Sequence, residues 1–431
     1  MKHFTKLAAA AALASLTAGA ALAEGLYAPN LSYRTGPFAA TGIPLMNGQK
    51  DYIEMLNARD GGIGGVLIDF DECETGYSTE KGVECYEKTK GKAIVTQPWS
   101  TGITLQVLPK TNVDEIPILA PGYGFSPMAD GKVFQWAFNT PSSYWDGASM
   151  ILRYLGEDSL AGKKIAFVHL DHPYGKEPIP FFEQKAAELG FEFLPIPVGL
   201  KEMQNQSAQW LQIRRERPDN VIMWGWGAMN AGAITEAVKT KYPMENMIGV
   251  WWSGHDADLA LVGQDGAGYK SISWSFPVAD APVMSDIKEY VIDAGKSQTN
   301  DTEMQGVFYA RGLVISMILA EGIRTAQDHF GTPNIEAEHL RWGLENLNVT
   351  EERLAELGMS GMVPPFQTTC ANHTGHSGGW MLEWDGAKFV KVSDHLMPES
   401  DVIAALEAEK AAEYAAANAP WPTNEACDAP S

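Results

Sequence analysis

Apolar runs alternate with amphipathic stretches along this chain from Leu31 onward. Short runs rich in branched and aromatic residues predict buried strands, and longer stretches with helical apolar spacing predict helices. The expected strands are 66–70, 93–96, 116–119, 164–170, 191–198, 221–224 and 247–251, and the expected helices are 42–59, 144–155, 178–189, 207–215 and 306–324. Strands that alternate with helices in this way build parallel sheets, so we expect an α/β fold.

A second series of such units begins at Lys164, behind the turn-prone segment 138–142. The 431 residues exceed what one hydrophobic core usually organises, so two domains are expected. The end of the chain differs, because 380–384 and 389–392 flank Asp385-Gly386, a sequence typical of a hairpin turn. The Ala- and Glu-rich stretch 404–417 predicts one surface helix.

The first residues have the pattern of a secretory signal peptide. Lys2 and Lys6 precede an apolar run that ends in Ala-Leu-Ala, which predicts cleavage after Ala23. The run is shorter than the roughly 20 apolar residues that span a bilayer, and hydroxyl residues interrupt it. No later segment is long and apolar enough to span, so we expect a periplasmic protein without direct membrane insertion.

The formal charge is −22, and it becomes −24 on cleavage because Lys2 and Lys6 are removed and no acidic residue is. A surface of this sign repels nucleic acid and anionic lipid, so neither is an expected partner.

Four cysteines in an exported chain predict two disulfides. Proximity in the sequence favours Cys73 with Cys85, and Cys370 with Cys427, which would fix the C-terminal tail. Other pairings remain open at this stage. A structural zinc site is the alternative, but the spacings contain no CxxC pair.

One segment matches a catalytic motif. Residues 375–379 read GHSGG, the GxSxG pattern in which Ser377 would be the nucleophile of a secreted hydrolase. That motif works where a strand enters the turn and a helix leaves it, whereas here polar residues precede the turn and a strand follows it. We therefore expect no enzymatic activity.

Other motifs indicate ordinary structure. His169 and His172 beside Asp171 lack a helix to present them to a metal, and 69–71 lacks the spacing of a calcium loop. The glycine-rich segment 61–65 has no lysine after it and fits the end of a helix better than a phosphate site. We assign no metal and no cofactor.

Aromatic residues collect near the expected strand ends. Ligands of open α/β sheets bind beyond the carboxyl ends of the strands, so this clustering favours a ligand cleft there, although any single ring could instead pack inside a lobe. The residues concerned are Trp99, Tyr123, Tyr174, Trp224, Trp226, Trp251 and Trp252.

These features resemble a known family, the leucine/isoleucine/valine-binding proteins of ABC importers. The resemblance covers nearly all of the mature chain and is carried by 32–37, 55–65, 120–122, 172–177 and 309–321. It implies a type I periplasmic binding fold, in which two Rossmann-like lobes joined by three crossings close on a small molecule, and an ABC permease of the inner membrane as partner.

The resemblance also implies where the lobes meet. It places the crossings near Thr140, Ser273 and His376, so that 24–139 plus 273–376 form the first lobe and 140–272 plus 377–431 form the second lobe and tail. A ligand sensor that docks on a signalling receptor is an alternative function for the same fold.

Ligand contacts carry over position by position. Trp99, Ser100 and Thr101 match a segment whose hydroxyl binds a ligand carboxylate, and Tyr123, Gly124 and Ser126 match further donors. Tyr174 matches a family tyrosine, and Trp224 or Trp226 matches an aromatic of the second lobe. An aromatic contact of the first loop is replaced by Thr41.

One departure bears on the ligand. The family glutamate that pairs with the ammonium group of an amino acid is replaced, because 249–254 reads GVWWSG and places Trp251 or Ser253 there. A buried ammonium without a counter-charge costs several kcal/mol, so we expect an uncharged or carboxylate-bearing aromatic or aliphatic ligand. The alternatives are Asp256 or Asp258 as a substitute, and a tryptophan cage for a methylated ammonium.

Overall fold

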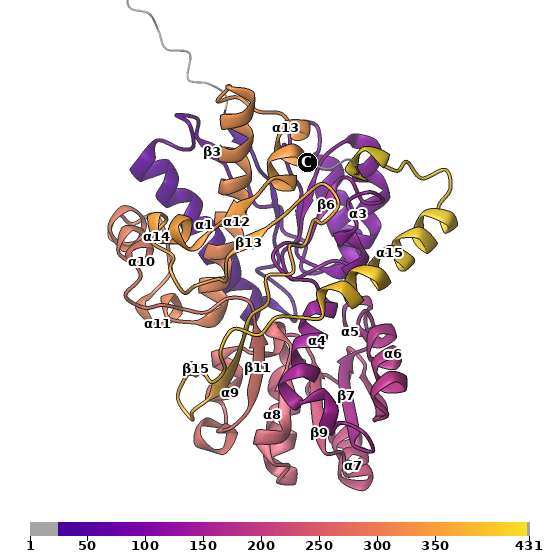
Figure 1. Ribbon diagram of the computed structural model, residues 1–431. Coiled ribbons are helices and arrows are strands. Elements are labelled where there is room, and N and C mark those ends of the chain that lie inside the picture. The colour runs from indigo at the N-terminus through magenta and orange to yellow at the C-terminus, as the bar shows by residue number, and fades with distance from the viewer. Residues whose placement is uncertain (1–24, 429–431) are drawn as a thin grey trace, which may run out of the picture.

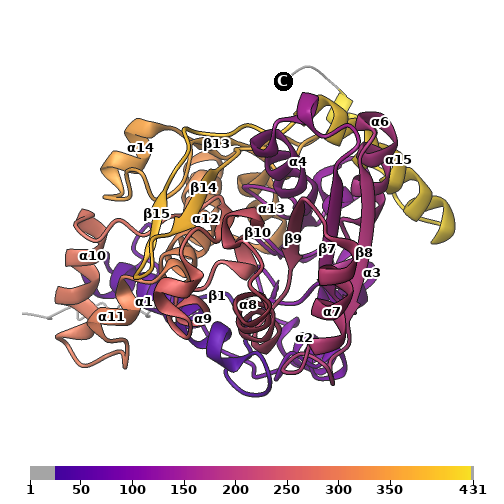
Figure 2. The same cartoon turned by 90° about the horizontal axis from the view of Figure 1, so that it is seen from below.

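Two lobes, each built around a mainly parallel sheet, form the computed structural model, which describes residues 25–428 (Figures 1 and 2). The signal peptide predicted for residues 1–23 lies outside the described residues. No helix between residues 25 and 428 has the length and apolar character needed to cross a membrane.

The sheet of the first lobe consists of short parallel strands. The pairs β1–β3, β2–β4 and β5–β6 are joined through the bridges Asn30–Glu72 and Thr96–Ile118 into one parallel arrangement. The strands are β1 (Leu26–Tyr27), β2 (Asn30–Leu31), β3 (Ile68–Asp69), β4 (Gln97–Pro98), β5 (Ile118–Leu119) and β6 (Ala137–Phe138).

The second lobe contains a seven-stranded sheet in the order β15-β14-β11-β10-β9-β7-β8. The strands are β7 (Lys164–Leu170), β8 (Glu192–Val198), β9 (Asn220–Trp224), β10 (Met247–Gly249), β11 (Lys270–Ser273), β14 (Trp380–Trp384) and β15 (Phe389–Lys391). β14 is antiparallel to both of its neighbours and forms the predicted hairpin with β15.

The helices of the first lobe pack around a close contact between two long ones. A Cβ atom on Gly48 of α1 would lie 2.2 Å from the carbonyl oxygen of Tyr309 in α12, so only glycine allows this approach. At Gly61 α1 ends in the left-handed region, as predicted for the glycine-rich turn. The helices are α1 (Ala39–Asp60), α2 (Thr79–Thr89), α3 (Thr101–Asp114), α10 (Pro282–Ile287), α11 (Asp301–Met304), α12 (Val307–Phe330), α13 (Ala337–Glu345) and α14 (Glu351–Glu356), beside the small pair β12 (Asn348–Val349) and β13 (Phe366–Gln367).

Helices cover both faces of the second sheet (Figure 2). They are α4 (Tyr144–Leu155), α5 (Pro173–Lys176), α6 (Ile179–Leu189), α7 (Ser207–Glu216), α8 (Ala228–Thr240) and α9 (Asp256–Ala260). α4 begins where it was predicted, because Ser143 and Asp146 form a capping box that satisfies the amides of its first turn.

The chain passes between the lobes after β6, after β11 and before β14. Two of these crossings are bonded to each other, since the Thr140 hydroxyl donates to the carbonyl oxygen of His373 (2.6 Å) and the Ser377 amide donates to that of Pro141 (3.0 Å). A buried pair of His376 Nδ1 and an Asp146 oxygen (2.7 Å) lies beside them. The lobe limits set from the sequence stay a prediction.

The C-terminal tail touches both lobes. α15 (Ser400–Ala417) begins beside the second lobe, where Glu399 pairs with the buried Lys185 (2.8 Å). Its end lies on the first lobe, where Trp421 Nε1 donates to the carbonyl oxygen of Val133 (2.7 Å) and Cys427 bonds to Cys370 (Figure 1). The tail was grouped with the second lobe, and these contacts also join its end to the first lobe.

Both predicted disulfides are confirmed, since Cys73 bonds to Cys85 and Cys370 to Cys427. Several element bounds differ from the prediction. In place of strand 93–96 the structure has β4 at Gln97–Pro98. Strand 247–251 ends at Gly249, and a 3-10 turn begins at Trp251. Helix 306–324 continues to Phe330. α3 was not predicted, because Gly102, Pro109 and several threonines weaken its helical pattern.

Candidate ligand-binding site

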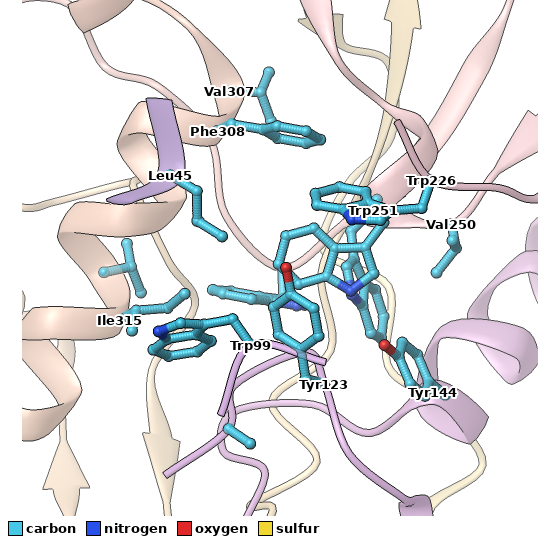
Figure 3. Close-up of a cluster of buried hydrophobic side chains, with 14 of the residues drawn as sticks. Leu45, Trp99, Tyr123, Tyr144, Trp226, Val250, Trp251, Val307, Phe308 and Ile315 are labelled. Atoms are coloured by element: carbon cyan, nitrogen blue, oxygen red, sulfur yellow. The ribbon is translucent and has the colours of Figure 1, made fainter. Parts of the chain in front are cut away.

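Aromatic loop residues from the two lobes meet in tilted and edge-on contacts, with Tyr123 and Trp226 facing each other across the lobes (Figure 3). Tyr123, which follows β5 of the first lobe, lies 4.3 Å from Trp252 of the second lobe, measured between ring centroids. Trp226 of the second lobe completes the group at 5.0 Å from Trp252 and 6.1 Å from Tyr33. We call Tyr33, Tyr123, Trp226 and Trp252 the interlobe cluster; all four side chains are buried.

Hydrogen bonds hold the lobes together around this cluster. The indole nitrogens of Trp251 and Trp252 both donate to the carbonyl oxygen of Gly122, at 3.2 and 2.5 Å. On one side the Asp256 carboxylate accepts the amide of Val307 at the start of α12 (2.8 Å). These bonds join groups of opposite lobes, so the structure shows a closed arrangement.

Glu177 forms a further contact between the lobes. One carboxylate oxygen accepts the Ser126 amide (2.8 Å), and the other is buried without a hydrogen-bond partner. Burial raises the pKa of Glu177 to about 7, although the bonds from Ser126 oppose the shift.

The predicted polar contacts of the first lobe lie beside the interlobe cluster. Ser100 caps α3, and the hydroxyl of Thr101, the first residue of that helix, is buried without a partner. Ser126 Oγ accepts the Trp145 amide (3.2 Å), and Gly124 adopts a positive φ of 89°. The start of a helix with an unused hydroxyl can bind a carboxylate or other hydrogen-bond acceptor.

Two of the predicted aromatic residues make their main contacts inside their own lobe. Trp224, at the end of β9, packs against Phe167 and Phe182 inside the second lobe. Trp99 donates its indole N–H to Asn30 within the first lobe, although its ring also meets Tyr123 (5.6 Å). Of the pair Trp224 and Trp226 left open by the sequence, the geometry therefore favours Trp226.

Tyr174 and Trp251 lie at the edge of the interlobe cluster. The Tyr174 hydroxyl donates to the carbonyl oxygen of Gly225 (2.9 Å), and Trp251 stacks on Tyr144 with centroids 5.6 Å apart. Tyr144 was not predicted, yet its hydroxyl is buried and has no hydrogen-bond partner among residues 25–428. Its position at the first residue of α4, directly after a crossing, is the signal that could have indicated it.

The position of the family glutamate holds no carboxylate. Ser253 Oγ accepts the Gly225 amide (3.0 Å) and donates to the Gly225 carbonyl oxygen (3.1 Å), so it shapes the loop. Asp256 is engaged by the Val307 amide, and burial raises its pKa. Asp258 lies 3.7 Å from His255 Nδ1 in the same short segment.

Arg311 is the residue that sequence reasoning missed. It lies on α12 with no exposed surface, and its guanidinium faces the rings of Trp252, Trp274 and Phe308 at 5.0, 5.4 and 5.0 Å. An arginine thus occupies an aromatic cage that includes Trp252. The signal in the sequence is a lone charge at the start of the apolar stretch 312–320.

A cavity of about 560 Å³ borders the interlobe cluster. Ile43 and Pro44 of α1 line it from the first lobe, and Ala260 of α9 and Trp384 of β14 line it from the second. Phe308 lines the cavity on the side of the interlobe cluster, and its ring centroid lies 5.5 Å from that of Trp226. Because both lobes supply its walls, its shape depends on how far they close.

The geometry gives the hydrolase motif no catalytic arrangement. The Ser377 hydroxyl donates to the carbonyl oxygen of Gly378 (3.4 Å), and His395 contacts the Ser377 carbonyl oxygen instead of the hydroxyl. A serine nucleophile needs a base at its hydroxyl. The described part of the chain also contains no group of three or more side chains placed to hold a metal ion.

Comparison with known proteins gives a consistent result. A family model of periplasmic binding proteins matches residues 26–388. A protein from the Pseudomonas fluorescens group, described as an ABC transporter permease, is 32% identical over 93% of this chain and 99% of its own, with a TM-score of 0.86. A search of curated proteins found no match.

More distant structures share the fold. A branched chain amino acid ABC transporter from Thermus thermophilus with bound valine is 22% identical over 87% of this chain and 97% of its own, with a TM-score of 0.75. A solute-binding protein from R. palustris in complex with benzoate is 18% identical over the same shares, with a TM-score of 0.67. The chain therefore belongs to the periplasmic binding protein family and has the type I fold. These are solute-binding proteins, not enzymes.

Proposed function

We propose that this protein is the periplasmic solute-binding component of an ABC importer and captures a small, largely apolar molecule by closure of its lobes. The observation that carries the proposal is the interlobe cluster, in which Tyr33 and Tyr123 of one lobe meet Trp226 and Trp252 of the other. A site divided between two lobes binds its ligand fully only when they close, so binding shifts the protein toward the closed form. An ABC permease would then receive that form.

The chemistry of the cluster indicates the body of the ligand. Indole and phenol rings supply apolar faces, and the N–H of Trp226 and the hydroxyls of Thr101 and Tyr144 are buried polar groups without partners. Such groups are costly to bury unsatisfied, and a ligand that bonds to them recovers that cost. An aromatic or aliphatic molecule with one polar head fits this pattern. Valine and benzoate, bound by two proteins of the same fold, are molecules of this size.

A thermal-shift screen of carboxylic acids, amides, amino acids and amines tests the proposal, because a ligand that binds the native state raises the melting temperature. We expect Trp226→Ala and Trp252→Ala each to remove that rise, since each deletes one wall of the cluster. Trp342→Ala is the matched control, because Trp342 lies in α13 and stacks on His329 (3.6 Å). Equal shifts in all three variants would contradict a ligand site at the interlobe cluster.

A further inference from the structure

Arg311 carries a charge in the buried interior of the molecule. Its side chain has no exposed surface and lies against Trp252, a member of the interlobe cluster. An ionised group removed from water loses its hydration, and this loss is large unless an opposite charge replaces the water. The question is which group supplies that charge.

Within the described chain the partners of Arg311 are neutral. Its three N–H bonds go to the Trp251 carbonyl oxygen (2.6 Å), Ser273 Oγ (2.9 Å) and Ser275 Oγ (3.1 Å). A guanidinium has five N–H groups, so one on each terminal nitrogen has no acceptor among residues 25–428. Asp256, an acidic residue whose charge acts on Arg311, is bonded to the Val307 amide instead.

Several other arginines of this acidic protein are paired with acidic residues. Arg34 binds Glu72, Arg59 binds Asp60, and Arg324 and Arg353 both bind Glu321. All four of these arginines are more exposed than Arg311. Arg311, which is more buried than these four and needs a counter-charge more, has no acidic hydrogen-bond partner in the described chain.

Building on the proposed function, we propose that the ligand is an organic anion, a carboxylate on an aromatic or aliphatic body, and that Arg311 supplies its counter-charge. Closure over an anion brings the two charges together in a medium from which water is excluded, where their attraction is strong. An amine would be repelled by the positive charge of Arg311. The aromatic cage that could hold an amine is already occupied by the Arg311 guanidinium. A zwitterion would find no carboxylate for its ammonium at the position of the family glutamate, because Ser253 stands there and is bonded to Gly225.

Matched compounds on the unmodified protein test this inference. The probes are benzoate, benzamide and benzylamine, and isovalerate, isovaleramide and isoamylamine, with leucine and phenylalanine as zwitterions. Isothermal titration calorimetry should show an acid binding about 100-fold more tightly than its amide, as expected for loss of a charged hydrogen bond, and no binding of the amines. The inference is overturned if an amide equals its acid, if an amine or amino acid binds best, or if neither acid binds at millimolar concentration.

Substitution gives a second test. Arg311→Gln removes the charge and should reduce the preference for acid over amide to less than about 3-fold, whereas Arg311→Lys should retain part of it. Arg324→Gln on the same helix is the control and should keep the full preference, since Arg324 pairs with Glu321. If Arg311→Gln fails to fold, the comparison of acids and amides still decides.

The two proposals fail in different ways. If Trp226→Ala abolishes binding of whichever compound binds best, and that compound is an amide or amine, the proposed function stands and the role of Arg311 is refuted. If ligands bind equally well without Trp226 and Trp252, the interlobe site itself is refuted.

Discussion

Replacement of Glu177 by glutamine should change how stability depends on pH. The carboxyl group joins the lobes through the Ser126 amide and is enclosed, so burial raises its pKa from the ordinary 4.5 to about 7. A group whose pKa is higher in the folded protein favours the folded state while it is protonated. Its contribution is full below pH 4.5 and is lost as the pH rises to about 7.

The size of the effect follows from the shift. A difference of this size corresponds to about 3 kcal/mol between the protonated and ionised forms. The wild type should therefore lose up to about 3 kcal/mol of unfolding free energy from this group between pH 4.5 and 8. Glu177→Gln has no proton to lose there, and its amide oxygen can still accept the Ser126 amide.

The assay is denaturant unfolding of both proteins across this pH range. Other buried acids also titrate, so the difference between the two profiles is the quantity to compare. Glu183→Gln is the control, because Glu183 lies nearby on α6 with an exposed side chain. Parallel profiles for wild type and Glu177→Gln would refute the reasoning, because they would mean that the carboxyl group keeps an ordinary pKa in the folded protein.

Two further predictions concern the first lobe and the tail. Gly48→Ala should destabilise the protein by about 3 kcal/mol or more, since the new methyl group would meet the carbonyl oxygen of Tyr309. Calorimetry measures the loss, and an unchanged melting temperature would contradict the close packing of α1 and α12. Cys427→Ser should lower the free energy of unfolding by up to about 4 kcal/mol, because the disulfide closes a loop with a sequence separation of 57. A reductant should lower the melting temperature of the wild type more than that of the variant, because the wild type loses two disulfides and the variant loses only Cys73–Cys85.

The sequence was sufficient where local chemistry decides the structure. α4 and β7 have the predicted bounds, because a capping serine starts the helix and an unbroken apolar run marks the buried strand. The hairpin follows from Asp385-Gly386, and the Cys73–Cys85 disulfide follows from the short separation of its two cysteines. These features depend on residues that are neighbours along the chain.

The direction of side chains at the site could not be predicted. Trp224 and Trp226 are two positions apart and would share a face if the strand continued, but β9 ends at Trp224 and Gly227 adopts a positive φ. One ring therefore enters the lobe and the other the interlobe cluster. Arg311 was missed for a related reason, since two of its three aromatic neighbours, Trp252 and Trp274, lie far from it in the sequence.

The tail has a mechanical consequence for the working cycle. α15 is anchored through Glu399 and Lys185 at one end and through the Cys370–Cys427 bond beyond the other, so it acts as a tether between the lobes in addition to the three crossings. A tether fixed at both ends permits rotation only until its slack is used up. If the lobes open to admit a solute, as proposed, the widest opening should be limited by the length of a segment that contributes no residue to the interlobe cluster.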